Sequence, residues 1–171
     1  DLRGQAIALG NLASNASQRG ETQRAIDLNS RALELFREVG AEFDAARTAY
    51  NLGLVHRRLG DLARAESMVR EASERFLASD SVSVAARALA ARGSMLVQTG
   101  RLEDAESVLR QLDELPIDSP MRRAEIETLH GELAAARGLT DAARQRFQTA
   151  LRLREDAPDW RRMSELDLAR V

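Results

Sequence analysis

The feature that most constrains this chain is an internal repeat of about 40 residues. Four glycines that end short polar turns recur along the sequence at spacings of 40, 40 and 38: Gly20, Gly60, Gly100 and Gly138. Each is preceded by a small residue seven positions earlier and followed by an alanine five positions later: Ala13, Gly53, Gly93 and Gly131, then Ala25, Ala65, Ala105 and Ala143. Columns that stay in step over four copies predict an array of structural repeats.

Each period reads as a helix, a tight turn and a second helix. Apolar residues recur at spacings of three and four before each turn glycine and again after it, and the strict alternation typical of strands is absent. Glycine ends the first helix because it tolerates a positive φ, and Asp61 or Thr140 can cap the next helix. We expect Pro116, Pro120 and Pro158 to stop helices between the units.

Glycines also stand in the middle of the predicted helices. Gly53, Gly93 and Gly131 each cost about 1 kcal/mol relative to alanine in a helix interior. We expect close approach of the partner helix in the same hairpin to explain them, with the alanines that follow each turn on the other side of the contact.

These residues carry a family resemblance. The second unit reads Ala49-x2-Leu52-Gly53-x2-His56, followed by Gly60, Ala65 and Ala72, and the first reads Leu9-x2-Leu12-Ala13-x2-Ala16, followed by Gly20, Ala25 and Ala32. The chain thus resembles the tetratricopeptide repeat (TPR) family over nearly its whole length. Arg92, Glu127 and His130 depart from the usual apolar residues, and the period is longer than the common 34 residues. This long form is similar to the repeats of kinesin light chains, cell-polarity adaptors and large bacterial regulators that join an ATPase to a DNA-binding domain.

The resemblance implies an all-α fold, a right-handed superhelical solenoid of antiparallel helix pairs. We expect a single solenoid over residues 1–171, with repeats at about 2–40, 41–80, 81–118 and 119–156. An extra helix is expected over 158–170, where Trp160, Met163, Leu166 and Ala169 share one face. The chain starts without methionine, and we expect it to be a fragment of a longer, cytoplasmic protein with flanking domains.

Composition argues against several classes of function. The chain has no cysteine and two histidines, which excludes disulfides and thiolate metal sites. The net charge of −2 gives no basic footprint for nucleic acid, and no apolar run is long enough to span a membrane. His56 and His130 fall at packing positions and read as core residues. Since the chain shows no phosphate loop, nucleophile elbow or metal motif, we expect no enzyme, catalytic residue, cofactor or metal.

The candidate site is a groove. In the TPR family the first helices of successive repeats line a concave surface, and a stripe beside the packing face would form it here: Asn11, Ser14, Arg47, Tyr50, Asn51, Leu54, Arg58, Arg87, Ser94, Glu125 and Glu132. Asparagine can donate to and accept from a peptide backbone, and arginine can bind a carboxylate with two hydrogen bonds. Against this, exposed arginines are usually solvated or in weak ion pairs, and an asparagine beside a helix crossing can simply brace the next helix.

The predicted function is therefore a protein–protein interaction module that binds a peptide or partner segment in its groove. Arg47, Arg58 and Arg87 make the first three repeats basic, whereas Glu125 and Glu132 make the fourth acidic, so the expected partner has an acidic end and a basic end. Basic residues are absent at Gly10 and Ala91, which argues against binding of chaperone tails. The alternative is a regulatory or sensor segment of a bacterial multidomain signalling or transcription regulator.

Overall fold

The computed structural model describes residues 1–155, and the regular structure in that range is entirely α-helical. The helices are α1 (Leu2–Gln18), α2 (Thr22–Glu38), α3 (Glu42–Arg58), α4 (Leu62–Ala78), α5 (Val82–Gln98), α6 (Leu102–Asp113), α7 (Pro120–Ala136) and α8 (Thr140–Glu155). The all-α prediction is confirmed for these residues. The helix expected over 158–170 lies outside them.

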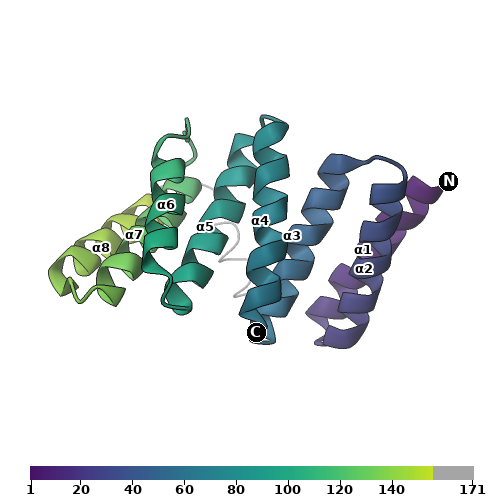
Figure 1. The fold of residues 1–171 in the computed structure, drawn as a ribbon, viewed down its shortest axis with the longest axis horizontal. Helices are drawn as coiled ribbons and strands as arrows, with labels where there is room; N and C mark the ends of the chain where they lie inside the picture. The colour runs from purple at the N-terminus through teal and green to yellow at the C-terminus, as the bar shows by residue number, and fades with distance from the viewer. Residues whose placement is uncertain (156–171) are drawn as a thin grey trace. The chain divides into compact units, whose positions relative to one another are not determined.

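The chain divides into two compact units, and the division falls inside α5, after Ala88. In the first unit α1 packs against α2, α2 against α3, and α3 against α4. In the second unit α6 packs against α7, and α7 against α8. Figure 1 shows that successive helices run in alternating directions within each unit, so the helices form antiparallel pairs.

One turn type joins almost all the helices. Gly20, Gly40, Gly60, Gly100 and Gly138 all have positive φ, between 66° and 80°. After α1 the Gly20 amide donates to the Ser17 carbonyl and the Glu21 amide donates to the Ala16 carbonyl at 2.9 Å, which is the Schellman arrangement. The same turn therefore lies within hairpins and also between them, as at Gly40, where the sequence pattern did not predict it.

The third hairpin breaks this regularity. Helix α6 has 12 residues, whereas the helices before it have 17, and the segment 114–119 leads on to α7. Pro120 is the first residue of α7, where its fixed φ suits the helix and its missing N–H is no loss. The expectation that Pro120 stops a helix was therefore wrong, because it starts one.

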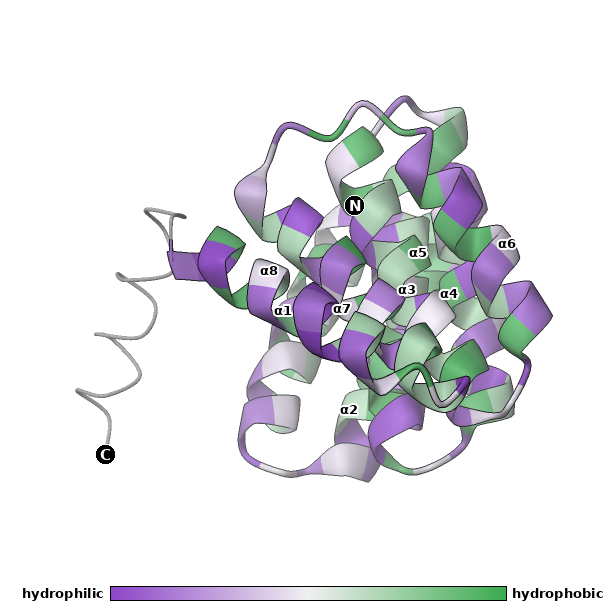
Figure 2. Cartoon of the chain, turned by 90° about the vertical axis from the view of Figure 1, so that its left-hand side faces the viewer, coloured by the Kyte–Doolittle hydropathy of each residue, from purple (hydrophilic) through white to green (hydrophobic). Residues whose placement is uncertain are grey.

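The core is built from small residues around a few aromatic rings. Ala25, Ala65 and Ala105 are fully buried, and Phe36 and Phe76 are almost so. Figure 2 shows that each labelled helix carries both hydrophilic and hydrophobic residues, as expected for helices that bury one face.

The helix-interior glycines do lie at close approaches. A Cβ on Gly53 would lie 2.8 Å from Cγ2 of Val69 and 3.1 Å from the carbonyl oxygen of Ala65, both on the hairpin partner α4. A Cβ on Gly131 would lie 2.6 Å from the ring of Phe147 on its partner α8. The glycine prediction therefore identified the close contact in these two hairpins.

Gly93 is different. A Cβ on this residue would overlap the side chain of Leu129, which belongs to α7 of the next hairpin. The expected contact with the partner helix α6 was therefore wrong at this position. The reason is that a first helix packs against the following hairpin as well as against its own partner, and both contacts ask for a small residue.

Candidate functional site

The predicted groove residues lie on the first helix of each hairpin. In the first unit they come from α1 (Asn11 and Ser14), α3 (Arg47, Tyr50, Asn51, Leu54 and Arg58) and the start of α5 (Arg87). In the second unit they come from the end of α5 (Ser94) and from α7 (Glu125 and Glu132). Spacings of three and four place the residues of each helix on one face, and each unit carries its own part of the candidate surface.

Ion pairs tie α1 to α3 at the first of these surfaces. Asp44 accepts a hydrogen bond from Arg3 of α1 and another from Arg47, both at 3.1 Å. One turn from the other end, Arg58 donates to the Ser17 hydroxyl at 2.5 Å. Arg47 is therefore exposed but shares a carboxylate, and such exposed pairs are weak enough for a competing carboxylate to exchange with them.

Tyr50 and Arg87 form the best-defined contact of the surface. Tyr50 is only 6% exposed, and the guanidinium carbon of Arg87 lies 4.9 Å from the centre of its ring. This cation–π contact restrains the orientation of the guanidinium plane. The Arg87 Nε atom is buried and has no hydrogen-bond partner among residues 1–155.

Two asparagines repeat at one position. Asn11 of α1 and Asn51 of α3 are 40 residues apart in the sequence, and both side chains are exposed. An exposed amide can donate and accept at the same time. Together with Arg47 and Arg87, these amides give the first unit a polar and basic surface.

The second unit is less acidic than its sequence suggests. Glu125 pairs with Arg122, one turn earlier on α7, at 2.5 Å, so its charge is compensated locally. Glu132 accepts a hydrogen bond from Ser94 of α5 at 2.6 Å. A hydroxyl donor leaves the negative charge in place, and the acidic character of this surface therefore rests mainly on Glu132.

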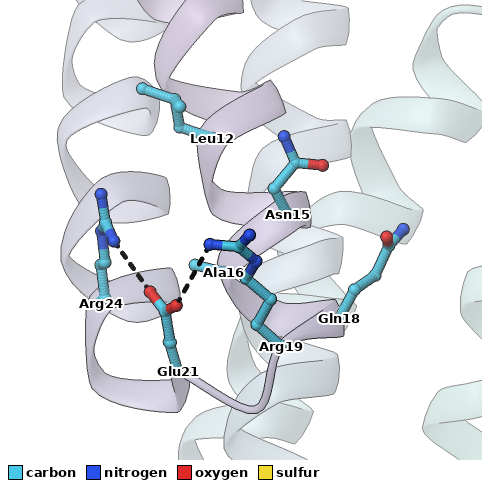
Figure 3. A pocket seen from close by; sticks show the side chains of 7 residues that line it. All are labelled: Leu12, Asn15, Ala16, Gln18, Arg19, Glu21 and Arg24. Atoms are coloured by element: carbon cyan, nitrogen blue, oxygen red, sulfur yellow. Dashed lines mark hydrogen bonds and ion pairs between the residues drawn. The ribbon is translucent and has the colours of Figure 1, made fainter.

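A hollow at the start of the chain lies apart from the predicted groove. It encloses about 480 Å³ between the end of α1 and the start of α2, and Figure 3 shows the residues that line it: Leu12, Asn15, Ala16, Gln18, Arg19, Glu21 and Arg24. The carboxylate of Glu21 lies between Arg24 at 2.9 Å and Arg19 at 3.9 Å. Both arginines thus have a local counter-charge.

The sequence held an unused signal for this hollow. Position 15 is asparagine, whereas the corresponding residues of the later repeats are apolar and buried: Val55, Met95 and Leu133. Leu12 is 48% exposed although its counterpart Leu52 is 2% exposed. The first repeat therefore differs from the others in both polarity and cover.

A second hollow follows from the short α6. It encloses about 590 Å³ beneath the segment 114–119, with Leu112, Leu115, Ile117, Ile126 and Leu153 among the residues that line it. Arg123 donates from Nε to the Ile117 carbonyl at 2.8 Å and so holds the segment against α7. The change of period from 40 to 38 was the signal in the sequence, although it did not predict a hollow.

The histidines belong to the structure of the hairpins. His56 is 7% exposed, with Nδ1 3.8 Å from the carboxylate of Asp61. His130 is half-buried, with Nε2 3.2 Å from Asp113. Among residues 1–155 there is no group of three or more histidine, aspartate or glutamate side chains suited to a metal ion. No helix in that range is long and apolar enough to cross a membrane.

Comparison with known proteins identifies the repeats. The sequence profile described as tetratricopeptide repeat matches residues 4–78 and 44–112, which together cover more than half of the chain. No curated protein matches the sequence.

Solved structures share the fold. The crystal structure of BtubC (BKLC) from P. vanneervenii superposes with a TM-score of 0.78 at 21% identity, covering 91% of this chain and 65% of that one. The chain thus spans just under two thirds of the length of that protein. A putative kinesin light chain from Podosopora anserina, described as having nearly identical TPR-like repeats, superposes with a TM-score of 0.71 at 11% identity over 86% of this chain and 74% of that one. At these identities the likeness shows the fold.

Proposed function

Because the chain belongs to the tetratricopeptide repeat family, we propose that it is a non-enzymatic protein–protein interaction module that binds a peptide or partner segment on the first helices of its repeats. The observation that carries this proposal is the Arg87 guanidinium, which rests on Tyr50 at 4.9 Å beside the exposed amide of Asn51. A planar cation restrained by an aromatic ring loses little side-chain freedom when it binds a carboxylate.

The proposed ligand of the first unit is an extended segment rich in aspartate or glutamate. Arg47 and Arg87 would bind its carboxylates, and Asn11 and Asn51 would pair with its backbone amides. For the second unit the proposal assigns a basic segment to Glu132, with a smaller part for Glu125 because Arg122 already neutralises it. A partner with an acidic end and a basic end would satisfy both surfaces.

The test uses labelled eight-residue peptides of three compositions, acidic, neutral and basic, with fluorescence anisotropy as the measurement. We expect the acidic peptides to bind best and their affinity to fall as salt rises, because an exposed surface is screened. Replacing Arg47 and Arg87 together by glutamine should weaken binding by about tenfold or more, since each arginine–carboxylate hydrogen bond contributes more than a neutral one.

The matched control is the pair Arg31→Gln with Arg70→Gln, two exposed arginines on the second helices α2 and α4. This control changes net charge by the same amount and should leave binding unchanged. If both double variants weaken binding equally, only net charge matters and the groove proposal is wrong. If none of the peptides binds, the alternative of a regulatory segment that contacts flanking domains of a bacterial regulator gains.

A further inference from the structure

Helix α8 presents an apolar face that the earlier hairpins bury. Phe147 is 41% exposed and Leu151 is 53% exposed, and with Ala135, Ala143 and the neighbouring polar residues they line a hollow of about 500 Å³. By contrast, Leu109 stands nine residues after its turn glycine, as Phe147 does, and is 3% exposed. The same position of the repeat is therefore covered in one hairpin and open in the next.

The cover in the third hairpin is known in detail. Helix α7 packs against α6, and two polar contacts fix how the helices pair. Arg137 donates to Glu106 at 2.8 Å, and His130 meets Asp113 at 3.2 Å. The first helix of a repeat thus lies along the second helix of the preceding repeat, with the residue eight before its turn facing the residue thirteen after the preceding turn.

The chain continues beyond α8 with a segment that matches this pattern. Trp160, Met163, Leu166 and Ala169 recur every third residue, which places them on one helical face. In the repeat alignment Ala169 corresponds to His130, and Leu151 corresponds to Asp113. The contact between His130 and Asp113 therefore has a direct counterpart in the pair of Ala169 and Leu151, and both members of that pair are apolar.

The length of the connection fits as well. Helix α8 ends at Glu155, so the residues between it and Trp160 number four. The connections that reverse the chain elsewhere take three residues, as at 39–41, or six, as at 114–119. Pro158 lies near the start of the segment, much as Pro120 lies at the start of α7.

We propose that residues 158–170 pack as a helix on the face of α8 formed by Phe147 and Leu151, with Ala169 against Leu151. The segment repeats on α8 the contact that α7 makes with α6, and it removes the apolar face from water. The proposal is independent of the peptide surface in the first unit, because it concerns only α8 and the segment that follows.

The absence of cysteine from the chain gives a clean test. In the full 171-residue protein, the pair Leu151→Cys with Ala169→Cys should form an intramolecular disulfide under mild oxidation, because a disulfide needs Cα atoms about 4.4 to 6.8 Å apart. The expected product is a monomer whose mobility on a non-reducing gel shifts, and it should form about tenfold or more faster than in the controls.

Two control pairs separate docking from chance encounter. Gln145→Cys with Ala169→Cys uses an exposed residue of the same helix that is turned away from Leu151 by more than a third of a turn. Leu151→Cys with Arg170→Cys moves the second cysteine by one residue to another face of the segment. Far-UV circular dichroism of each reduced variant should match that of the parent chain, which shows that the substitutions leave the helices formed.

The outcomes are distinct. Preferential cross-linking of the pair 151 and 169 within one chain supports the proposal. Equal cross-linking of all three pairs overturns it, since the segment would then only collide with α8. Disulfide-linked dimers that increase with protein concentration also overturn it, because the face would then pair with a second copy.

Discussion

Glycine has opposite energetic effects at two positions of similar appearance in the sequence. Gly10 and Gly53 both lie inside helices, but an added Cβ meets nothing within 4 Å at Gly10 and meets Val69 and the Ala65 carbonyl at Gly53. We therefore expect Gly10→Ala to raise the free energy of unfolding by about 1 kcal/mol through helix propensity. Gly53→Ala should lower it, because overpacking costs about 1 to 3 kcal/mol.

Urea denaturation followed by circular dichroism measures both changes. Gly53→Leu extends the series and should cost more than Gly53→Ala, because a larger side chain must displace α4. Equal effects of alanine and leucine at position 53 would show that no close helix crossing exists there. A gain in stability from Gly53→Ala would contradict the 2.8 Å approach of Val69.

Asp80 occupies the place that glycine takes in the other turns. Its φ is 52°, and left-handed backbone costs an L-residue roughly 1 to 2 kcal/mol. Asp80→Gly should therefore stabilise the protein by about 0.5 to 1 kcal/mol, since the extra freedom of glycine in the unfolded chain offsets part of the gain. Thermal melting is the measurement, and Gly40→Asp is the reciprocal variant, which should melt at a lower temperature. Two shifts of the same sign would contradict this account.

The sequence predicted residue-scale features where a backbone rule applied. Glycines at 20, 60, 100 and 138 were expected to have positive φ, and they do, because few other residues adopt it cheaply. The turn at Asp80 carries no glycine and gave no such signal. The neighbour of Gly93 was predicted wrongly because small size says that something comes close but does not say which helix.

At the scale of elements, the packing of α7 on α6 depends on a charged pair. The side chain of Arg137 donates a hydrogen bond to Glu106 at 2.8 Å. This hydrogen bond, together with the positive charge of Arg137, holds the pKa of Glu106 below its ordinary value, and the same contact raises the pKa of Arg137. The pair is exposed, so its contribution is sensitive to salt.

The sign of the pH effect follows from the lowered pKa of Glu106. The folded state favours the ionised carboxylate, so the stabilisation is present above the unfolded pKa of about 4.3 and is lost as pH falls through the lower folded value. We expect Glu106→Gln to lower the melting temperature near neutral pH and to make it less sensitive to acidification. Melting curves between neutral and acidic pH test this. Gln111→Glu on the same helix is the control for added charge, and parallel pH profiles for Glu106→Gln and the parent would contradict the expectation.

Element boundaries were predictable to different degrees. The hairpins with the strict 40-residue period follow from turn glycines and apolar spacing. Helix α6 ends at Asp113, five residues short of its counterparts, and the sequence hinted at this only through Pro116 and the shorter period. The irregular segment 114–119 and its hollow depend on how α6, α7 and Leu153 of α8 pack together, which local patterns do not encode.

At the scale of the molecule, the sequence identified the faces of the candidate site but not its electrostatics. Repeat spacing placed Asn11 with Asn51 and Arg47 with Arg87. The shared carboxylate of Asp44, the partner Arg122 of Glu125 and the stacking of Arg87 on Tyr50 depend on rotamers and on side chains of neighbouring helices. Charge counting from sequence therefore overstates how much unpaired charge each surface offers a partner.

Repeat architecture also predicts a gradient of local stability within the first unit. Each repeat is stabilised mainly by its neighbours, and α1 buries three residues whereas α3 buries nine. Helix α3 packs against both α2 and α4, and α1 packs against α2. We expect backbone amides of α1 to exchange with deuterium at least about tenfold faster than those of α3, because local opening exposes less apolar surface where less is buried.

Hydrogen exchange read by mass spectrometry measures this gradient, with α2 and α4 as internal references, since each buries five residues. These two helices should fall between α1 and α3 in protection. Equal protection of α1 and α3 would mean that the first unit opens as one cooperative block, which nearest-neighbour stabilisation does not produce. Leu12→Gln sharpens the distinction: Leu12 is 48% exposed, so the substitution should leave the exchange of α1 almost unchanged, whereas Leu52→Gln, at the equivalent buried position, should accelerate exchange in α3 and in both helices that pack against it.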